Sequence, residues 1–203
     1  MKFGKYLLAL ALAAGVVSAA PCLATGQDVK TIGSCTIGVL TFSNFDWSLA
    51  SGSGGPVALS GLIPSNGLNF TPNMNGAGDL HFTFSVSAAP GNVITAFLTN
   101  NGLGGTFVQE KVCSAPFTNP QLNGTCAATT LANFGAASGV TTSGNLSTPQ
   151  STIWVWKDIF SDASGHLTSF DQSFSSTTVT PEPMTLSMMG AGLLALGLVR
   201  RKK

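Results

Sequence analysis

The sequence is short of charge. Only 8% of its 203 residues are Asp, Glu, Lys or Arg, whereas ordinary soluble domains carry about a quarter. Most of the basic residues lie near the two ends. Between positions 20 and 180, three lysines stand against seven acidic residues, which gives a net charge of about −4. A body of this charge repels phosphate backbones, so we exclude a nucleic-acid partner.

The sequence also lacks the patterns on which catalytic and metal sites usually depend. It contains no GxSxG, no HExxH and no phosphate-binding glycine loop. The two histidines, His81 and His166, are expected at the surface, and no CxxC or HxxxH pattern brings Cys and His ligands together. We therefore expect no catalytic residue, no metal, no cofactor and no enzyme activity. A hydrolase would need two acidic side chains that converge in a cleft.

The N-terminus indicates export. Two lysines precede an apolar stretch at positions 6–17, which is followed by small residues; this is the order of a secretory signal peptide. The stretch is short for a bilayer span. Cleavage after Ala19 and cleavage after Ala24 both satisfy the small-residue rule, and the choice decides whether Cys22 stays in the mature chain. We assign residues 1–19 to the signal peptide.

Cleavage after residue 19 leaves four cysteines, an even number in an oxidising compartment. Four cysteines allow three patterns of disulfides. We favour Cys22 with Cys35 and Cys113 with Cys126, because the members of each pair are thirteen positions apart and close short loops. Each bond would restrict the unfolded chain by roughly 3 kcal/mol.

The body consists of short segments between turns rich in Gly and Pro. In the segment 79–87, apolar and polar residues alternate, which predicts a strand with one buried face. Comparable runs begin at positions 35, 56, 92, 105 and 151. The segment 135–150, rich in Gly, Ser and Thr, is expected to be a surface loop. The pattern predicts an all-β fold, a single antiparallel β-sandwich domain at 20–174, followed by a polar linker at 175–180.

The chain ends with an apolar run and a cluster of cations. Residues 184–199 carry no charge, and as a helix they would extend about 24 Å, somewhat less than the hydrocarbon core of about 30 Å. Terminal cations lengthen such a span by snorkelling and hold their end in the cytoplasm. We expect a C-terminal transmembrane helix at 184–199 and a basic membrane stop formed by Arg200, Arg201, Lys202 and Lys203.

A Pro-Glu-Pro triplet, Pro181, Glu182 and Pro183, comes directly before this run. The triplet, the apolar span and the basic end together make residues 181–203 resemble the PEP-CTERM sorting signal of exopolysaccharide-producing Gram-negative bacteria. The resemblance implies that an exosortase recognises the triplet, and that the protein is held transiently in the inner membrane with its body in the periplasm. It then reaches the cell surface or the extracellular matrix. The prolines keep Glu182 in an extended, accessible segment.

The body also resembles one group of PEP-CTERM proteins, more loosely. The similar runs are GSCTIGVLTFSNFDWS from Gly33, VWKDI from Val155 and SFDQSF from Ser169. This second resemblance implies no biochemical activity.

Two roles stay open for the domain. The first is a structural or interaction role at the surface or in the matrix, and the second is that of a carbohydrate-binding module that recognises exopolysaccharide. Trp47, Trp154 and Trp156 are the candidate sugar contacts, because an indole offers a broad apolar face and one hydrogen-bond donor. Large aromatic side chains are also expected in the core, so the exposure of these three rings distinguishes the two interpretations.

Overall fold

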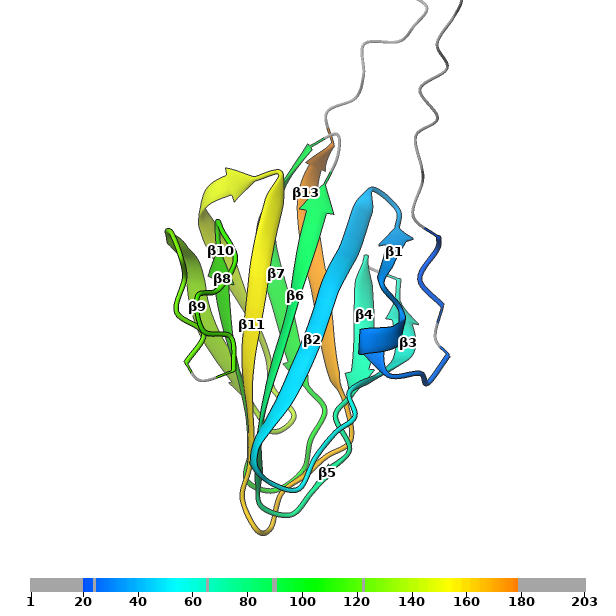
Figure 1. Ribbon diagram of the computed structural model, residues 1–203, viewed down its shortest axis with the longest axis vertical. Helices are drawn as coiled ribbons and strands as arrows, with labels where there is room; N and C mark the ends of the chain where they lie inside the picture. Colours follow the sequence, from blue (N-terminus) through cyan, green and yellow to red (C-terminus); the bar gives the residue numbers. More distant parts are fainter. Residues whose placement is uncertain (1–19, 24, 65, 89–90, 122, 179–203) are drawn as a thin grey trace, which may run out of the picture.

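The computed structural model describes residues 20–23, 25–64, 66–88, 91–121 and 123–178 (Figure 1). The expected signal peptide, sorting triplet, transmembrane helix and basic membrane stop therefore lie outside the described residues. Within these residues, no helix is long and apolar enough to cross a membrane.

The described chain is all-β and forms two main antiparallel layers, as the alternating pattern predicted (Figure 1). One layer is a six-stranded sheet, in the order β1 (Ser34–Ile37), β2 (Leu40–Gly52), β6 (Gly78–Ala88), β11 (Thr152–Ser161), β8 (Thr106–Cys113) and β9 (Thr130–Ala137). The other is a five-stranded sheet, in the order β10 (Thr141–Gln150), β7 (Gly91–Asn100), β13 (Phe170–Thr178), β4 (Gly67–Thr71) and β3 (Ala58–Ile63). The short strands β5 (Met74–Asn75) and β12 (His166–Leu167) pair with each other, and a 3₁₀ turn, η1 (Val29–Thr31), precedes β1.

The core lies between the two sheets and is rich in phenylalanine. On β6, the apolar members of the predicted alternation are fully buried, while the polar members point to the outer face. Phenylalanine rings from the two sheets are in contact across the core; the ring centroids of Phe70 and Phe82, for example, are 4.9 Å apart. Burial of each such side chain contributes about 1.5–3 kcal/mol. The main contributors are Phe42, Phe45, Phe70, Phe82, Phe84, Phe170 and Phe174.

The expectation of a surface loop at 135–150 is wrong. Strand β9 continues to Ala137, and β10 occupies Thr141–Gln150, so the chain passes here from the six-stranded to the five-stranded sheet. Two of the glycines that suggested a loop are explained instead by close packing against aromatic rings. A Cβ at Gly135 would overlap the Phe107 ring, and one at Gly144 would overlap the Phe134 ring.

Strand β13 lies in the middle of the five-stranded sheet, between β7 and β4, although it is the last strand of the described sequence. It continues to Thr178, into the segment expected as a linker. Its pairing with β7 extends over nearly its whole length. Its first half, Phe170–Ser173, pairs with β4 as well, whereas its end pairs with β7 alone.

Both expected disulfides are present in the structure, Cys22–Cys35 and Cys113–Cys126. The first joins the N-terminal segment to β1, where Cys22 also donates its backbone N–H to the carbonyl of Thr36 at 2.9 Å. The second closes the segment 114–125, and we call its described residues, 114–121 and 123–125, the cover loop. This loop folds over the outer face of the six-stranded sheet.

A buried ion pair lies in the core between the sheets. Lys157 of β11 and Glu110 of β8 are both 0% exposed, and Lys157 Nζ is 2.6 Å from Glu110 Oε2. Lys157 also donates to the side-chain oxygen of Gln172, and the Gln172 amide donates to Glu110 Oε1 at 3.2 Å. Burial raises the pKa of Glu110, while burial lowers the pKa of Lys157 against the opposing effect of the Glu110 charge. Lys157 therefore links the two strands of one sheet to β13 of the other.

Candidate functional site

A groove of about 690 Å³ crosses the outer face of the five-stranded sheet. Phe97 and Thr99 of β7 lie beside Asp171 of β13 on its floor, and Thr141 of β10 closes one side. The turn between β1 and β2 and the turn between β3 and β4 form a rim, with Val39, Ile63 and Asn66.

The strand period places these side chains in the groove. On β7, Ala96 and Leu98 are fully buried in the core, so Phe97 between them points outward and is 38% exposed. The register pairs Phe97 with Ser173 and Thr99 with Asp171. Paired residues in a sheet share a face. An exposed aromatic ring therefore lies beside hydroxyl groups and one carboxylate.

A row of hydrogen bonds orders the polar part of the groove. The hydroxyls of Thr99 and Thr141 are 2.9 Å apart. On the other side, the Asn69 amide donates to Asp171 Oδ1, and the Ser60 hydroxyl donates to Asn69 Oδ1. The Asp171 carboxylate is thus oriented by its neighbours from β4 and β3. A fixed carboxylate of this kind accepts hydrogen bonds from hydroxyl groups of a ligand.

The structure places the three tryptophans away from this groove. Trp154 and Trp156 share the outer face of the six-stranded sheet, as their spacing predicted, but Trp156 is only 4% exposed. The cover loop lies on it, and the indole N–H of Trp156 donates to the carbonyl of Pro120 at 2.7 Å. A sugar therefore cannot stack on Trp156 while the loop is in place. Trp154 is half-buried.

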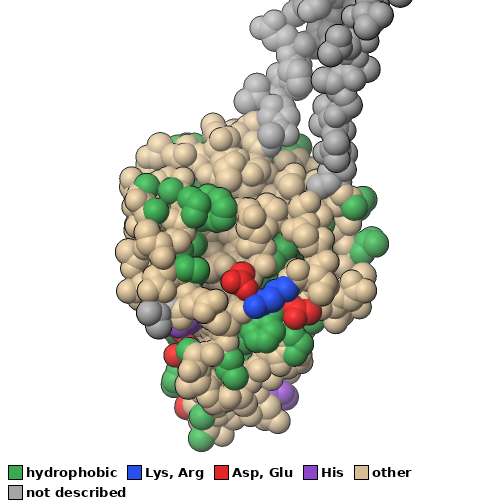
Figure 2. Space-filling model, in the orientation of Figure 1, with side chains coloured by type: hydrophobic (Ala, Val, Ile, Leu, Met, Phe, Trp, Pro, Cys, Tyr) green, Lys and Arg blue, Asp and Glu red, His purple; other side chains and the backbone are tan. Residues whose placement is uncertain are grey.

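Trp47 packs against the edge of the core and is half-buried. Its indole N–H donates to Asp28 Oδ1 at 2.9 Å, and Lys30 Nζ lies 4.9 Å from the centre of the ring. Lys30 is in turn 2.8 Å from the carboxylate of Asp46. The indole N–H and the ring face of Trp47 are thus both engaged by other residues of the protein. Charged side chains are few on this side of the molecule, which the six-stranded sheet forms (Figure 2).

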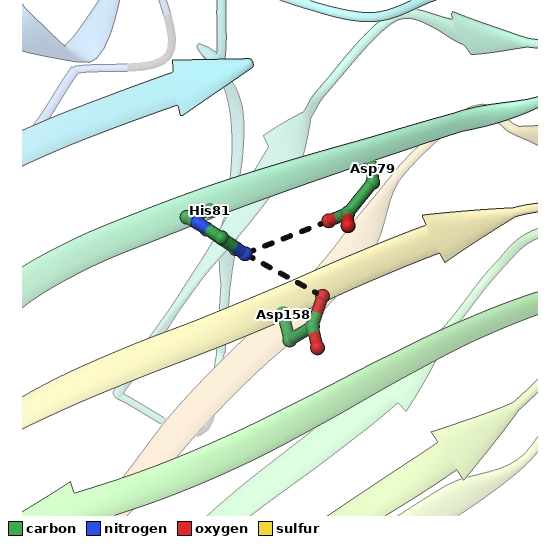
Figure 3. Close-up of side chains that lie close together, drawn as sticks. All are labelled: Asp79, His81 and Asp158. Atoms are coloured by element: carbon green, nitrogen blue, oxygen red, sulfur yellow. Dashed lines mark ion pairs between the residues drawn. The ribbon is translucent and has the colours of Figure 1, made fainter. Parts of the chain in front are cut away.

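A second group of polar side chains lies on the outer face of the six-stranded sheet and consists of Asp79, His81 and Asp158 (Figure 3). His81 was expected at the surface, but it is only 6% exposed, because the cover loop packs over it. Burial and the negative charge of Asp79 raise the pKa of Asp158 above its ordinary value. The spacing of Cys and His in the sequence did not predict this group. The signal available was Asp79 and His81, two positions apart on one strand.

Comparisons with known proteins assign no family. No protein-family model matches the chain, and no curated protein matches it. Among solved structures, one match is a carbohydrate-binding module, TmCBM61, solved in complex with β-1,4-galactotriose: 14% identity, a TM-score of 0.40, and coverage of 66% of this chain and 90% of that chain. Another is the enzymatically active domain of tailspike protein 4 of bacteriophage CBA120: 10% identity, a TM-score of 0.35, and coverage of 66% and 20%. At these TM-scores neither similarity indicates a function.

Proposed function

We propose that this protein is an exported surface or matrix protein whose β-sandwich binds polysaccharide in the groove of the five-stranded sheet. The observation that carries the proposal is the composition of that groove. It combines the exposed ring of Phe97, the oriented carboxylate of Asp171 and a row of Ser and Thr hydroxyls. A sugar has apolar C–H faces and many hydroxyl groups, and it needs both kinds of contact.

The size and charge of the groove limit the ligand. Its volume of about 690 Å³ lies in the range of about 300–1,000 Å³ that is usual for small-molecule sites. Of the described residues that line it, none is Lys or Arg, and Asp171 carries a negative charge. Because like charges repel, the groove favours a short neutral segment of a polysaccharide over an acidic one.

Replacement of the Phe97 ring or the Asp171 carboxylate tests whether the groove binds polysaccharide. We expect Phe97→Ala and Asp171→Asn each to weaken binding of a neutral exopolysaccharide about tenfold, since central contacts of an interface are typically worth more than about 1 kcal/mol. Titration calorimetry with polysaccharide from the producing cells measures this. Because Phe97 is partly covered and Asp171 accepts from Asn69, urea denaturation of each variant confirms that the protein tested for binding is folded.

Phe160→Ala is the matched control. Phe160 is 49% exposed but lies on the outer face of the six-stranded sheet. This variant is expected to bind as the unchanged protein does. Equal losses in Phe97→Ala and Phe160→Ala, or no binding of polysaccharide by the unchanged protein, would refute the groove as the site.

The export part of the proposal includes processing by an exosortase at Pro181, Glu182 and Pro183. Two disulfides support an oxidising compartment, and the tail resembles a sorting signal. We expect the Glu182→Ala protein to keep its tail and to accumulate in the membrane fraction. Fractionation and immunoblotting of the producing cells measure this, with Asp162→Ala as the control. If Glu182→Ala is trimmed and reaches the surface at the normal rate, the triplet is not the recognition element.

A further inference from the structure

The fold brings Asp79, His81 and Asp158 together from two neighbouring strands. Asp79 and His81 are two positions apart on β6, so they share its outer face. The register of β6 and β11 places Asp158 directly opposite His81. All three side chains therefore point to the same place above the six-stranded sheet (Figure 3).

The distances from His81 to the two carboxylates are too long for hydrogen bonds and suit a shared ion. His81 Nε2 is 3.6 Å from Asp79 Oδ1 and 4.0 Å from Asp158 Oδ1. One ligand atom from each residue lies within 4.8 Å of the others. Ligands placed tetrahedrally about 2.1 Å from a metal ion are about 3.4 Å apart. Small side-chain rotations therefore bring the three atoms onto one ion.

A hydrogen bond at the other ring nitrogen of His81 fixes the tautomer of the ring. Nδ1 is 2.7 Å from the carbonyl oxygen of Gln121 in the cover loop. A carbonyl only accepts, so Nδ1 carries a proton, and in the neutral ring the lone pair is on Nε2, facing the two carboxylates. A backbone carbonyl on the second nitrogen is the usual arrangement of a metal-binding histidine.

Among the described residues of this cluster, one buried polar atom has no hydrogen bond, Asp79 Oδ1. The His81 side chain is more than nine-tenths buried, and its Nε2 faces the two carboxylates at 3.6 and 4.0 Å. Buried polar atoms are nearly always paired, and two neighbouring carboxylates repel each other. A cation between the three groups satisfies all of them.

We propose that Asp79, His81 and Asp158 bind one divalent transition-metal ion, for which Zn²⁺ is the probe. The ligand atoms are His81 Nε2 and one oxygen of each carboxylate. An imidazole nitrogen suits Zn²⁺, whereas Ca²⁺ and Mg²⁺ prefer ligand sets made of oxygen. Three protein ligands leave a position open. The three residues line a cavity of about 640 Å³ together with Ser48 and Asn119, so water or a ligand hydroxyl has room to bind there.

The ion would hold the cover loop on the sheet. Metal binding fixes the His81 ring, and the ring holds Gln121 through its Nδ1 hydrogen bond. The site lies on the opposite sheet from the groove. The failure of one proposal therefore leaves the other untouched.

Metal titration of the full chain tests the proposal. After treatment with EDTA and dialysis, we expect Zn²⁺ to bind in calorimetry with one equivalent, and more tightly than Ca²⁺. Saturating Zn²⁺ should raise Tm by roughly 5 °C or more. Asp158→Asn and His81→Gln should each weaken Zn²⁺ binding at least about tenfold and abolish the zinc-dependent rise in Tm.

His166→Gln and Asp162→Asn are the matched controls, because both residues are exposed and lie outside the cluster. Both should bind Zn²⁺ as the unchanged protein does. Since His81→Gln can lower stability by itself, the half-buried Asp158→Asn, with the same shape as the original side chain, is the decisive variant. The proposal is wrong if no equivalent of Zn²⁺ binds, if Asp158→Asn binds it normally, or if Ca²⁺ binds as tightly as Zn²⁺.

Discussion

The Lys157→Met protein is expected to be less stable than the unchanged protein by about 3–5 kcal/mol, because the substitution leaves a buried carboxylate without its partner. Glu110 is 0% exposed and accepts hydrogen bonds from Lys157 and Gln172. Once Lys157 is gone, only the neutral Gln172 amide remains, and it cannot balance the charge. Urea denaturation at neutral pH measures the loss.

The size of this loss should depend on pH. Burial raises the pKa of Glu110 in the folded protein above the ordinary value of 4.5, and removal of Lys157 raises it further. A group whose pKa is higher in the folded than in the unfolded state favours folding at low pH, and this contribution is lost as pH rises through the folded pKa. The difference between Lys157→Met and the unchanged protein is therefore smaller at pH 5 than at pH 8.

Two further variants make the test specific. The double variant Lys157→Met and Glu110→Leu removes both charges and should recover most of the lost stability, because well-packed apolar residues can replace a buried ion pair. Lys111→Met changes a half-exposed lysine of β8 that donates to the carbonyls of Asn123 and Gly124, and it should cost less than Lys157→Met because water can reach the groups it leaves. A loss below about 1 kcal/mol in Lys157→Met at neutral pH would contradict the role assigned to the pair.

The second large effect is expected when Cys113 and Cys126 are both replaced by Ala. The loop-entropy estimate for a loop of this length is about 3 kcal/mol. A local effect should come with it, since this disulfide closes the cover loop that buries Trp156. Release of the loop hydrates the ring, so the tryptophan emission should shift to longer wavelength before global unfolding.

The chain supplies a control of the same length. Cys22 and Cys35 have the same sequence separation of 13 as Cys113 and Cys126. Their joint replacement by Ala should cost a similar amount of stability, but the loop that they close carries Asp28 and Lys30, which contact Trp47. A Trp47→Phe background therefore isolates the emission of the remaining tryptophans, and in it only the loss of Cys113 and Cys126 should shift the emission. If both double variants shift it equally in this background, the cover loop is not held on Trp156 by its own disulfide.

Features of the fold that depend on nearby residues can be predicted from the sequence. The alternation at 79–87 predicted β6 and its buried face, and equal spacing of the cysteines predicted the two pairs. Alternation along β11 places Lys157 on the inner face of that strand with Ile153, Val155 and Ile159. This pattern does not show that Glu110 and Gln172 accept hydrogen bonds from Lys157, because these two residues come from β8 and β13.

The sites escaped prediction for the same reason. Phe97 and Asp171 face one groove only because β7 pairs with β13, and that register is not encoded within either segment. Asp158 joins Asp79 and His81 through the pairing of β11 with β6. The glycines of β9 and β10 were interpreted as turn residues, whereas two of them make room for aromatic rings. Composition shows that glycine is present and does not show which ring needs the space.

The central position of β13 determines when the domain can fold. The last strand of the described residues inserts between β7 and β4, so the five-stranded sheet stays divided until residues 170–178 are available. Contacts between residues so distant in sequence form slowly, and partly formed sheets expose edges that aggregate. Under the export proposed above, late closure of this sheet would keep the polypeptide able to pass through a narrow translocation pore before the sandwich forms.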